Sequence, residues 1–297
     1  MAANKIQAVG RGITMTSGMR QDFAMGLNSM VKAWAASNLH VWTVSEGILF
    51  PQPSQIQYGA GTGATDHITG AYYQTTLTAA AAIGQTAIPV ASTANMTVGD
   101  NIGFLLAGGS IQWTTISTFT STSVSIALPG LTDVVAAGNY CWNYTSNLVR
   151  PLKVVAYRRL NIASGIETPL IPPIARLNYM ALPNKTQTGN INQVFYDPQL
   201  NIGYFYLWNP IAVIDTLLKF TYWRPIQDFD AGGDNPDLPI EWVNPLVFNL
   251  ALLMAPDFSV PMDKFQQVKL LADQFLDDAR GFDREAESIN FEVDNSP

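Results

Sequence analysis

Residues 241–258 read EWVNPLVFNLALLMAPDF, and their composition predicts how the two ends of the chain pack. Between Glu241 and Asp257 it holds fifteen consecutive residues without a charge. That is fewer than the roughly 20 apolar residues of a membrane span, and Asn244 and Asn249 interrupt it. Its apolar residues run round every side of a helix, so the helix must be enclosed on every side. The stretch therefore predicts the central helix of a packed bundle, with any uncovered face against a sheet or a neighbouring subunit.

Two further segments have the apolar spacing of helices that bury one face. The first follows Ser17, which can cap it, and the second lies near the acidic end of the chain. Three helices that each need to bury an apolar face can do so by packing on one another. The expected core residues of this bundle are Phe23, Leu27, Trp34, Trp242, Leu246, Leu250, Phe265 and Phe275.

The sequence changes character between Tyr72 and Asn147. This segment has no lysine or arginine, and its only acids are Asp100 and Asp133. Threonine, serine, valine and isoleucine alternate in short runs broken by glycine-containing turns, which is typical of a small all-β unit. The expected strands are residues 87–90, 102–106, 111–117, 124–128 and 140–144.

Charged, mixed sequence resumes at Leu148, so the β unit at 72–147 is predicted to be inserted into an adaptor-like core formed by residues 1–71 and 148–297. Residues 51–73 are expected to be a connector. Residues 191–210 predict a hairpin around Asp197, and residues 217–226 predict a third strand of the same sheet. The predicted fold class is α+β: an α-helical bundle with an antiparallel β-hairpin sheet, plus an inserted small all-β domain, either a barrel or a sandwich.

The composition indicates a surface that partners cover. Of the 297 residues 47% are hydrophobic and 13% are charged, against roughly 25% charged residues in an ordinary soluble protein. The net charge of −7 does not favour tight binding of nucleic acid, which needs a basic surface. Cys141 is the one cysteine, so an intrachain disulfide framework and a cysteine-rich zinc site are excluded. The start of the sequence lacks the apolar run of a signal peptide, and we expect a soluble chain made in the cytoplasm.

Candidate catalytic residues are few. The two histidines, His40 and His67, are expected to be a packed residue and a linker residue. The glycines of YGAGTGAT lack the Lys-Ser/Thr ending of a phosphate loop, so they predict a hinge. Four acids in a Gly/Pro loop are expected to be solvated turn residues without the spacing of a calcium loop: Asp228, Asp230, Asp234 and Asp237. We expect no enzyme activity, no cofactor and no metal site.

The C-terminal stretch is strongly acidic. From Asp257 to Asp294 there are ten acids against four basic residues. In its last ten residues, SINFEVDNSP, the apolar residues Ile289, Phe291 and Val293 alternate. This end is either a solvated helix face with a frayed tail or a strand that adds to a partner protein, and we favour the second.

Several stretches resemble the head-to-tail adaptor proteins of short-tailed bacteriophages, also called tail tubular protein A or tail accessory factor. LNSMVKAWAASNLHVWTVSEGILF (27–50) resembles the N-terminal signature of that family. YDPQLNIGYFYLWNP, LLKFTYWRPIQDFD and LPIEWVNPLVFNLALLMAPDF, in this order, are similar to its second half. TAIPVASTANMTVGDNIGFLLAGGSIQWTTIS (86–117) resembles a β module that recurs in phage structural proteins.

The resemblance implies a virion structural protein at the neck of the tail. Identical subunits, twelve by expectation, would form a ring between the portal protein and the tail nozzle protein, and genomic DNA would pass through without specific binding. The bundle would be residues 17–37, 239–255 and 263–281. A C-terminal extension, 282–297, would contact the portal through Phe282, Ile289, Phe291 and Val293. Contact of the inserted β domain with tail fibres is left open.

Two alternatives from other classes remain. One is a cell-wall glycan hydrolase that uses Asp228 or Asp234 and carries the β domain as a glycan-binding module. The other is a protein that binds a host receptor or a fibre through the inserted β domain.

Overall fold

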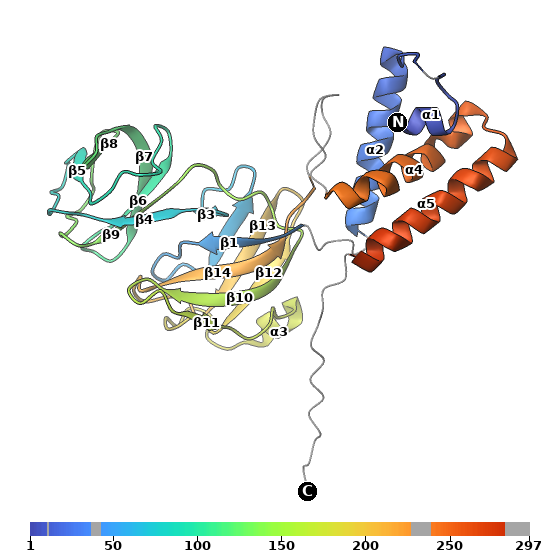
Figure 1. Ribbon diagram of the computed structural model, residues 1–297. Coiled ribbons are helices and arrows are strands. Elements are labelled where there is room, and N and C mark those ends of the chain that lie inside the picture. Colours follow the sequence, from blue (N-terminus) through green and yellow to red (C-terminus); the bar gives the residue numbers. More distant parts are fainter. Residues whose placement is uncertain (11, 37–42, 227–238, 283–297) are drawn as a thin grey trace, which may run out of the picture. The chain divides into compact units, whose positions relative to one another are not determined.

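A computed structural model describes residues 1–10, 12–36, 43–226 and 239–282 of the chain (Figure 1). Contacts divide the chain into two compact units. Met1–Thr43 and Pro225–Pro297 form the first, here called the helical unit, and Val44–Arg224 form the second, called the β unit. The helical unit is therefore built from both ends of the sequence.

The predicted fold class is wrong. Over the described residues the structure is mostly β, with three antiparallel sheets and 26% helix, rather than a helical bundle that carries an inserted β domain. The prediction gave most weight to the long apolar helices, whose periodicity is strong. It missed the strands in residues 57–69 and 153–169, several of which are short or irregular, and these complete the five-stranded and three-stranded sheets.

Four α-helices form the described part of the helical unit. They are α1 (Ala2–Lys5), α2 (Ser17–Ala36), α4 (Val243–Met254) and α5 (Met262–Phe282), with short 3-10 turns at Ile240–Trp242 and Ala255–Phe258. Helix α4 packs against each of the other three. Left-handed backbone at Ser259, with φ of 49°, turns the chain between α4 and α5. The stretch that is apolar on every side thus lies at the centre of this unit.

A five-stranded antiparallel sheet is the largest element of one half of the β unit. Its order is β11 (Glu167–Pro169), β10 (Lys153–Asn161), β14 (Thr216–Trp223), β1 (Val44–Leu49) and β3 (Ile68–Thr69). Strands β1 and β14 pair along their whole length, from Val44 opposite Trp223 to Leu49 opposite Leu218. The register of β10 shifts between Val154 and Ala156, which breaks the alternation that sequence patterns detect.

A three-stranded sheet consists of β12 (Gln193–Pro198), β13 (Ile202–Trp208) and β2 (Gln57–Gly61), in that order. The predicted hairpin around Asp197 is confirmed as β12 and β13. The third strand is β2, which comes from the expected connector, whereas the predicted third strand is β14 of the five-stranded sheet. The connector prediction is therefore wrong. Helix α3 (Arg176–Ala181) packs on β12.

The six-stranded sheet corresponds to the charge-poor segment. Its order is β4 (Tyr73–Thr76), β9 (Tyr140–Tyr144), β6 (Asn101–Leu105), β7 (Ile111–Phe119), β8 (Ser123–Ile126) and β5 (Ala87–Pro89), and the five predicted strands are confirmed. A bridge between Leu77 and Val90 links the chain after β4 to the chain after β5, so the sheet closes on itself. Apolar side chains such as Ile88, Phe104 and Val124 fill the interior.

Candidate functional site

The eight expected bundle residues all lie in the helical unit. Phe23, Trp242, Leu246 and Leu250 are buried, and the other four, Leu27, Trp34, Phe265 and Phe275, are partly buried. Most belong to one apolar cluster shared by the four helices. Trp242 lies in a smaller cluster with Ala279, and its ring centre is 5.7 Å from that of Trp34. Each fully buried side chain of this size contributes about 1.5–3 kcal/mol.

Helix α4 is covered over much of its surface because two neighbours approach it closely, although Leu253 and Val243 stay exposed. On α2, a Cβ at Gly26 would fall 2.9 Å from Sδ of Met254 and 3.4 Å from Cδ1 of Leu250, so glycine lets the two helices approach. Helix α1 covers another side, where Nζ of Lys5 lies 4.6 Å from the ring centre of Phe248. The sequence pattern missed α1, because four residues are too few to show helical periodicity.

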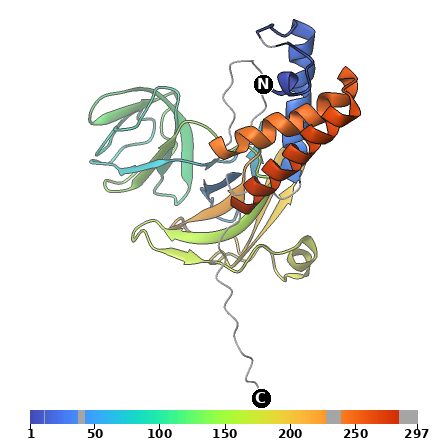
Figure 2. The ribbon, with the colours of Figure 1, turned by 45° about the vertical axis from the view of Figure 1, so that its right-hand side comes forward.

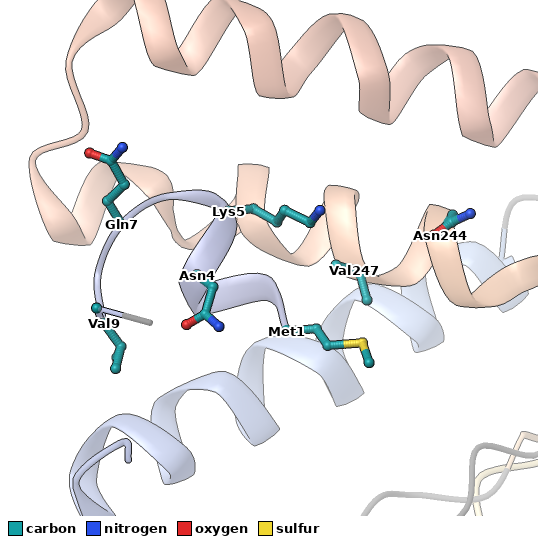
Figure 3. A pocket seen from close by; sticks show the side chains of 8 residues that line it. Met1, Asn4, Lys5, Gln7, Val9, Asn244 and Val247 are labelled. Atoms are coloured by element: carbon teal, nitrogen blue, oxygen red, sulfur yellow. The ribbon is translucent and has the colours of Figure 1, made fainter. Parts of the chain in front are cut away.

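A groove with a volume of about 790 Å³ lies between α1 and α4 (Figure 3). Its walls combine amide side chains, one cationic side chain and apolar carbon: Met1, Asn4, Lys5, Gln7, Val9, Gly10, Asn244 and Val247. These residues offer hydrogen bonds and apolar contact. They do not include a carboxylate or a hydroxyl nucleophile.

Large apolar side chains of the helical unit are also left exposed. Met25 on α2 is 65% exposed, Leu253 on α4 is 48% exposed and Leu270 on α5 is 69% exposed. Met25 is next to Gly26 in the sequence, and Leu253 lies beside that glycine in space. Met25 and Leu253 therefore lie where α2 crosses α4. These helices thus leave large apolar side chains exposed as well as packing against one another.

The expected portal contacts fall at the end of the described chain. Phe282 is the last residue of α5, and its side chain lies outside the described part of the structure, as do Ile289, Phe291 and Val293. The same holds for His40 and for the four acids of the Gly/Pro loop, Asp228, Asp230, Asp234 and Asp237.

Within the β unit, a cluster of rings fastens the six-stranded sheet to the other two sheets. This aromatic joint consists of Phe50, His67, Tyr72, Trp113, Trp142 and Tyr144. The ring of Phe50 is at its centre, with ring centroids 5.0 Å from Trp113 and 5.5 Å from Tyr72. Beside it, the side-chain amide of Gln52 donates to the carbonyl of Ile111 at 2.8 Å and accepts from its N–H at 3.0 Å. The six-stranded sheet is therefore held by packing and by hydrogen bonds.

His67 belongs to this joint, so its prediction as a linker residue is wrong. Its ring stacks on Trp113 with centroids 4.0 Å apart, and its Nδ1 is 2.5 Å from the hydroxyl of Tyr144. The hydroxyl of Tyr144 donates its one proton to Oδ1 of Asn147 at 2.6 Å, so towards His67 it can only accept a hydrogen bond. Nδ1 of His67 therefore carries a proton and donates it to Tyr144. Burial lowers the pKa of His67 to about 4, so the imidazole is neutral at pH 7.

Four charged residues form a closed group on the five-stranded sheet: Glu46, Arg158, Glu167 and Lys219. Nζ of Lys219 is 2.7 Å from Glu167 and 3.0 Å from Glu46, and Arg158 contacts both acids. Hydrogen bonds from Arg158 and Lys219 lower the pKa of Glu46, and the bond to Glu167 raises the pKa of Lys219. Two positive and two negative charges cancel, so this group stabilises the sheet rather than presenting a charge.

Comparisons do not identify the chain. No family model, curated protein or solved structure matches it. Within the described ranges, no three histidine, cysteine or acidic side chains lie close enough to hold a metal ion. The helices in the same part of the chain are each too short or too polar to cross a membrane.

Proposed function

We propose that this chain is a virion structural protein, a head-to-tail adaptor that forms a ring between a portal protein and a tail nozzle. Its ring, dodecameric in this proposal, lines the channel through which DNA passes. One observation carries the proposal. Two of the stretches that resemble the adaptor family, 27–50 and 238–258, lie far apart in the sequence, and their helices α2 and α4 pack against each other in the helical unit.

That packing involves specific contacts. Trp34, in the first stretch, makes an edge contact with Trp242 in the second, with ring centres 5.7 Å apart. Just before the first stretch, Gly26 allows α2 to approach Met254 and Leu250. Residues chosen by sequence resemblance alone have no reason to meet in space, so their contact supports a shared structural role.

Exposed apolar side chains on the helices favour assembly. A chain with 13% charged residues and apolar residues such as Met25, Leu253 and Leu270 at its surface gains free energy when neighbours cover them. The negative net charge suits a channel for DNA, because an acidic wall repels phosphate and does not retain it. The C-terminal residues 282–297 would bind the portal.

The experiment is electron microscopy of the purified chain with and without the portal protein of the same phage. We expect rings on the portal, and a chain that never binds the portal contradicts the proposal. In the extension, Phe291→Ala and Val293→Ala should each weaken portal binding about tenfold, which corresponds to about 1.4 kcal/mol. The neighbouring Asn290→Ala and Asn295→Ala are matched controls and should leave binding unchanged.

A further inference from the structure

Exposed apolar residues gather on two loops at one end of the six-stranded sheet. Ile83 is 65% exposed, Leu128 is 85% exposed and Val134 is 39% exposed. Their loops are joined by backbone hydrogen bonds, from Gly84 N–H to Leu131 at 2.7 Å and from Leu131 N–H to Gln85 at 3.1 Å. We call Ile83, Leu128 and Val134 the loop platform.

Two glutamine side chains hold these loops in place. Gln112 of β7 donates to the carbonyl of Gly130 at 2.9 Å and accepts from the N–H of Thr132 at 2.7 Å. Gln85 accepts from the N–H of Ala82 at 2.9 Å and donates to the carbonyl of Ala87 at 2.6 Å. The platform is therefore preorganised, and a partner does not have to order it on binding.

Charge restricts what the platform can bind. Residues 72–147 contain no lysine or arginine. The two acids of this segment use their carboxylates internally, because Asp100 accepts from Thr97 N–H and Asp133 accepts from the N–H groups of Gly108 and Val134. Phosphates, acidic sugars and acidic peptides find no counter-charge here. An apolar protein surface is the complementary partner.

The β unit carries a second surface of that kind on and before α3. Ile171 is 53% exposed, Leu177 is 77% exposed and Met180 is 59% exposed, and we call these three residues the α3 face. Residues 170–182 include one charge, Arg176, which is paired with Asp197 at 2.5 Å. Tyr179 anchors the helix by stacking on Phe195 and packing against Tyr206. The α3 face is thus also rigid, and the ammonium of Lys185 lies beside it, donating to the carbonyls of Met180 at 3.1 Å and Leu182 at 3.0 Å.

Within the β unit, the six-stranded sheet and α3 lie at opposite ends in both views (Figures 1 and 2). The aromatic joint and the two hydrogen bonds of Gln52 fix the six-stranded sheet to the other sheets. When one surface of a rigid subunit binds a different surface of the next subunit, each subunit is rotated by the same angle relative to the one before it. The subunits form a closed ring when a whole number of these rotations makes a full turn.

We propose that the loop platform of one copy packs against the α3 face of the next copy. This inference rests on the proposed function, because it assigns the contact through which neighbouring subunits of the ring associate. The contact is heterologous: each copy contributes its platform to one neighbour and its α3 face to the other.

The first test places a charge at each surface of the full chain. Leu128→Lys and Leu177→Lys change exposed side chains, so folding should be unaffected, and a circular dichroism melt checks this. Self-association measured by sedimentation velocity should weaken at least tenfold in each variant. Thr122→Lys, at an exposed turn between β7 and β8, is the control and should associate like the unmodified chain. Unchanged association of both platform and α3 variants would overturn the proposal.

The second test checks the direction of the contact. Chains with Leu128→Cys are mixed with chains carrying Leu177→Cys and oxidised; the native Cys141 is buried and its pKa is raised, so it does not compete. We expect a cross-link in the mixture and little in either chain alone. Cross-linking of Leu128→Cys chains with one another, or none in the mixture, contradicts the proposal. If Leu128→Lys chains bind the portal as well as the unmodified chain does, the result contradicts this inference and leaves the adaptor function standing. If the specific cross-links form but the chain does not bind the portal, the result contradicts the adaptor function instead.

Discussion

The ring of Tyr196 on β12 lies directly over Gly203 on β13. A Cβ at position 203 would fall 2.5 Å from Cζ of that ring, and the hydroxyl of Tyr196 donates to the carbonyl of Pro151 at 2.6 Å. Glycine thus leaves the space in which the ring lies, and the hydrogen bond holds the ring there.

Gly203→Ala should destabilise the β unit by about 2–4 kcal/mol. The added methyl group displaces a rigid ring from a packed core, and the hydrogen bond to Pro151 is lost with it. Urea unfolding followed by tryptophan fluorescence measures the change. Gly189→Ala is the control, because a Cβ there meets Asn209 at an ordinary 3.7 Å. Equal stability of the two variants would show that Tyr196 can move without cost.

Tyr157 and Tyr196 make a matched pair of buried hydroxyls. Among the described residues the hydroxyl of Tyr157 has no hydrogen-bond partner, whereas that of Tyr196 bonds to Pro151. Tyr157→Phe should therefore be neutral or stabilise by up to about 1 kcal/mol, and Tyr196→Phe should destabilise by about 0.5–1.5 kcal/mol. Denaturant unfolding of both variants decides this; a loss of stability in Tyr157→Phe would show that its hydroxyl is satisfied.

His67 should make the stability of the β unit depend on pH. Its folded pKa of about 4 lies below the value of about 6.5 in an unfolded chain, so the unfolded chain binds more protons between these values. Stability is complete above about pH 6.5 and falls as the pH drops towards 4. The half-buried ring is partly screened by solvent, so the loss should be about 1–2 kcal/mol.

The measurement is the free energy of unfolding of the native chain and of His67→Asn from pH 7 to pH 4. The asparagine amide keeps a donor near the hydroxyl of Tyr144 and does not titrate. The stability difference between the two chains should shrink as the pH falls, and other titrating groups cancel because both chains share them. A difference that is constant with pH would refute the role given to His67.

Glu46→Gln should have a small, salt-dependent effect. The carboxylate is 49% exposed, and exposed ion pairs contribute roughly 0–1 kcal/mol. Since its pKa is lowered in the folded state, this contribution is present above the unfolded value near 4.5 and is lost as the pH falls through the folded pKa. At pH 7 the cost should decrease between 0.05 M and 1 M salt, as thermal unfolding can show. A cost above about 2 kcal/mol would mean that the four charges act as a buried network.

Local patterns predicted those elements whose residues alternate or repeat regularly. Five of the six strands of the six-stranded sheet were predicted because they are short alternating runs broken by glycine-containing turns, and α2, α4 and α5 because their apolar residues recur at helical spacing. Strand β2 was missed because Gly59 and Gly61 suggest a hinge, and β10 because its bulge near Val155 interrupts the alternation. The share of α-helix in the fold was therefore overestimated.

The candidate surfaces were harder to foresee than the core. Pattern alone places Phe23 and Leu250 on apolar faces, but it does not show that Gly26 lets these helices approach each other. Likewise Glu46 and Arg158 are separated by 112 residues, and their contact follows from the order of strands in the sheet. The loop platform depends on hydrogen bonds between two loops, which no periodicity records.

The pairing of Val44 with Trp223 has a consequence for the history and the engineering of this chain. Residues paired across antiparallel strands have Cα atoms only about 4.5–5.5 Å apart, so the β unit begins and ends at nearly one point. A segment with adjoining ends can be removed and replaced by a linker of a few residues, or transferred whole to another host protein. The β unit is in this sense an interchangeable cassette, and the helical unit is the frame that accepts it.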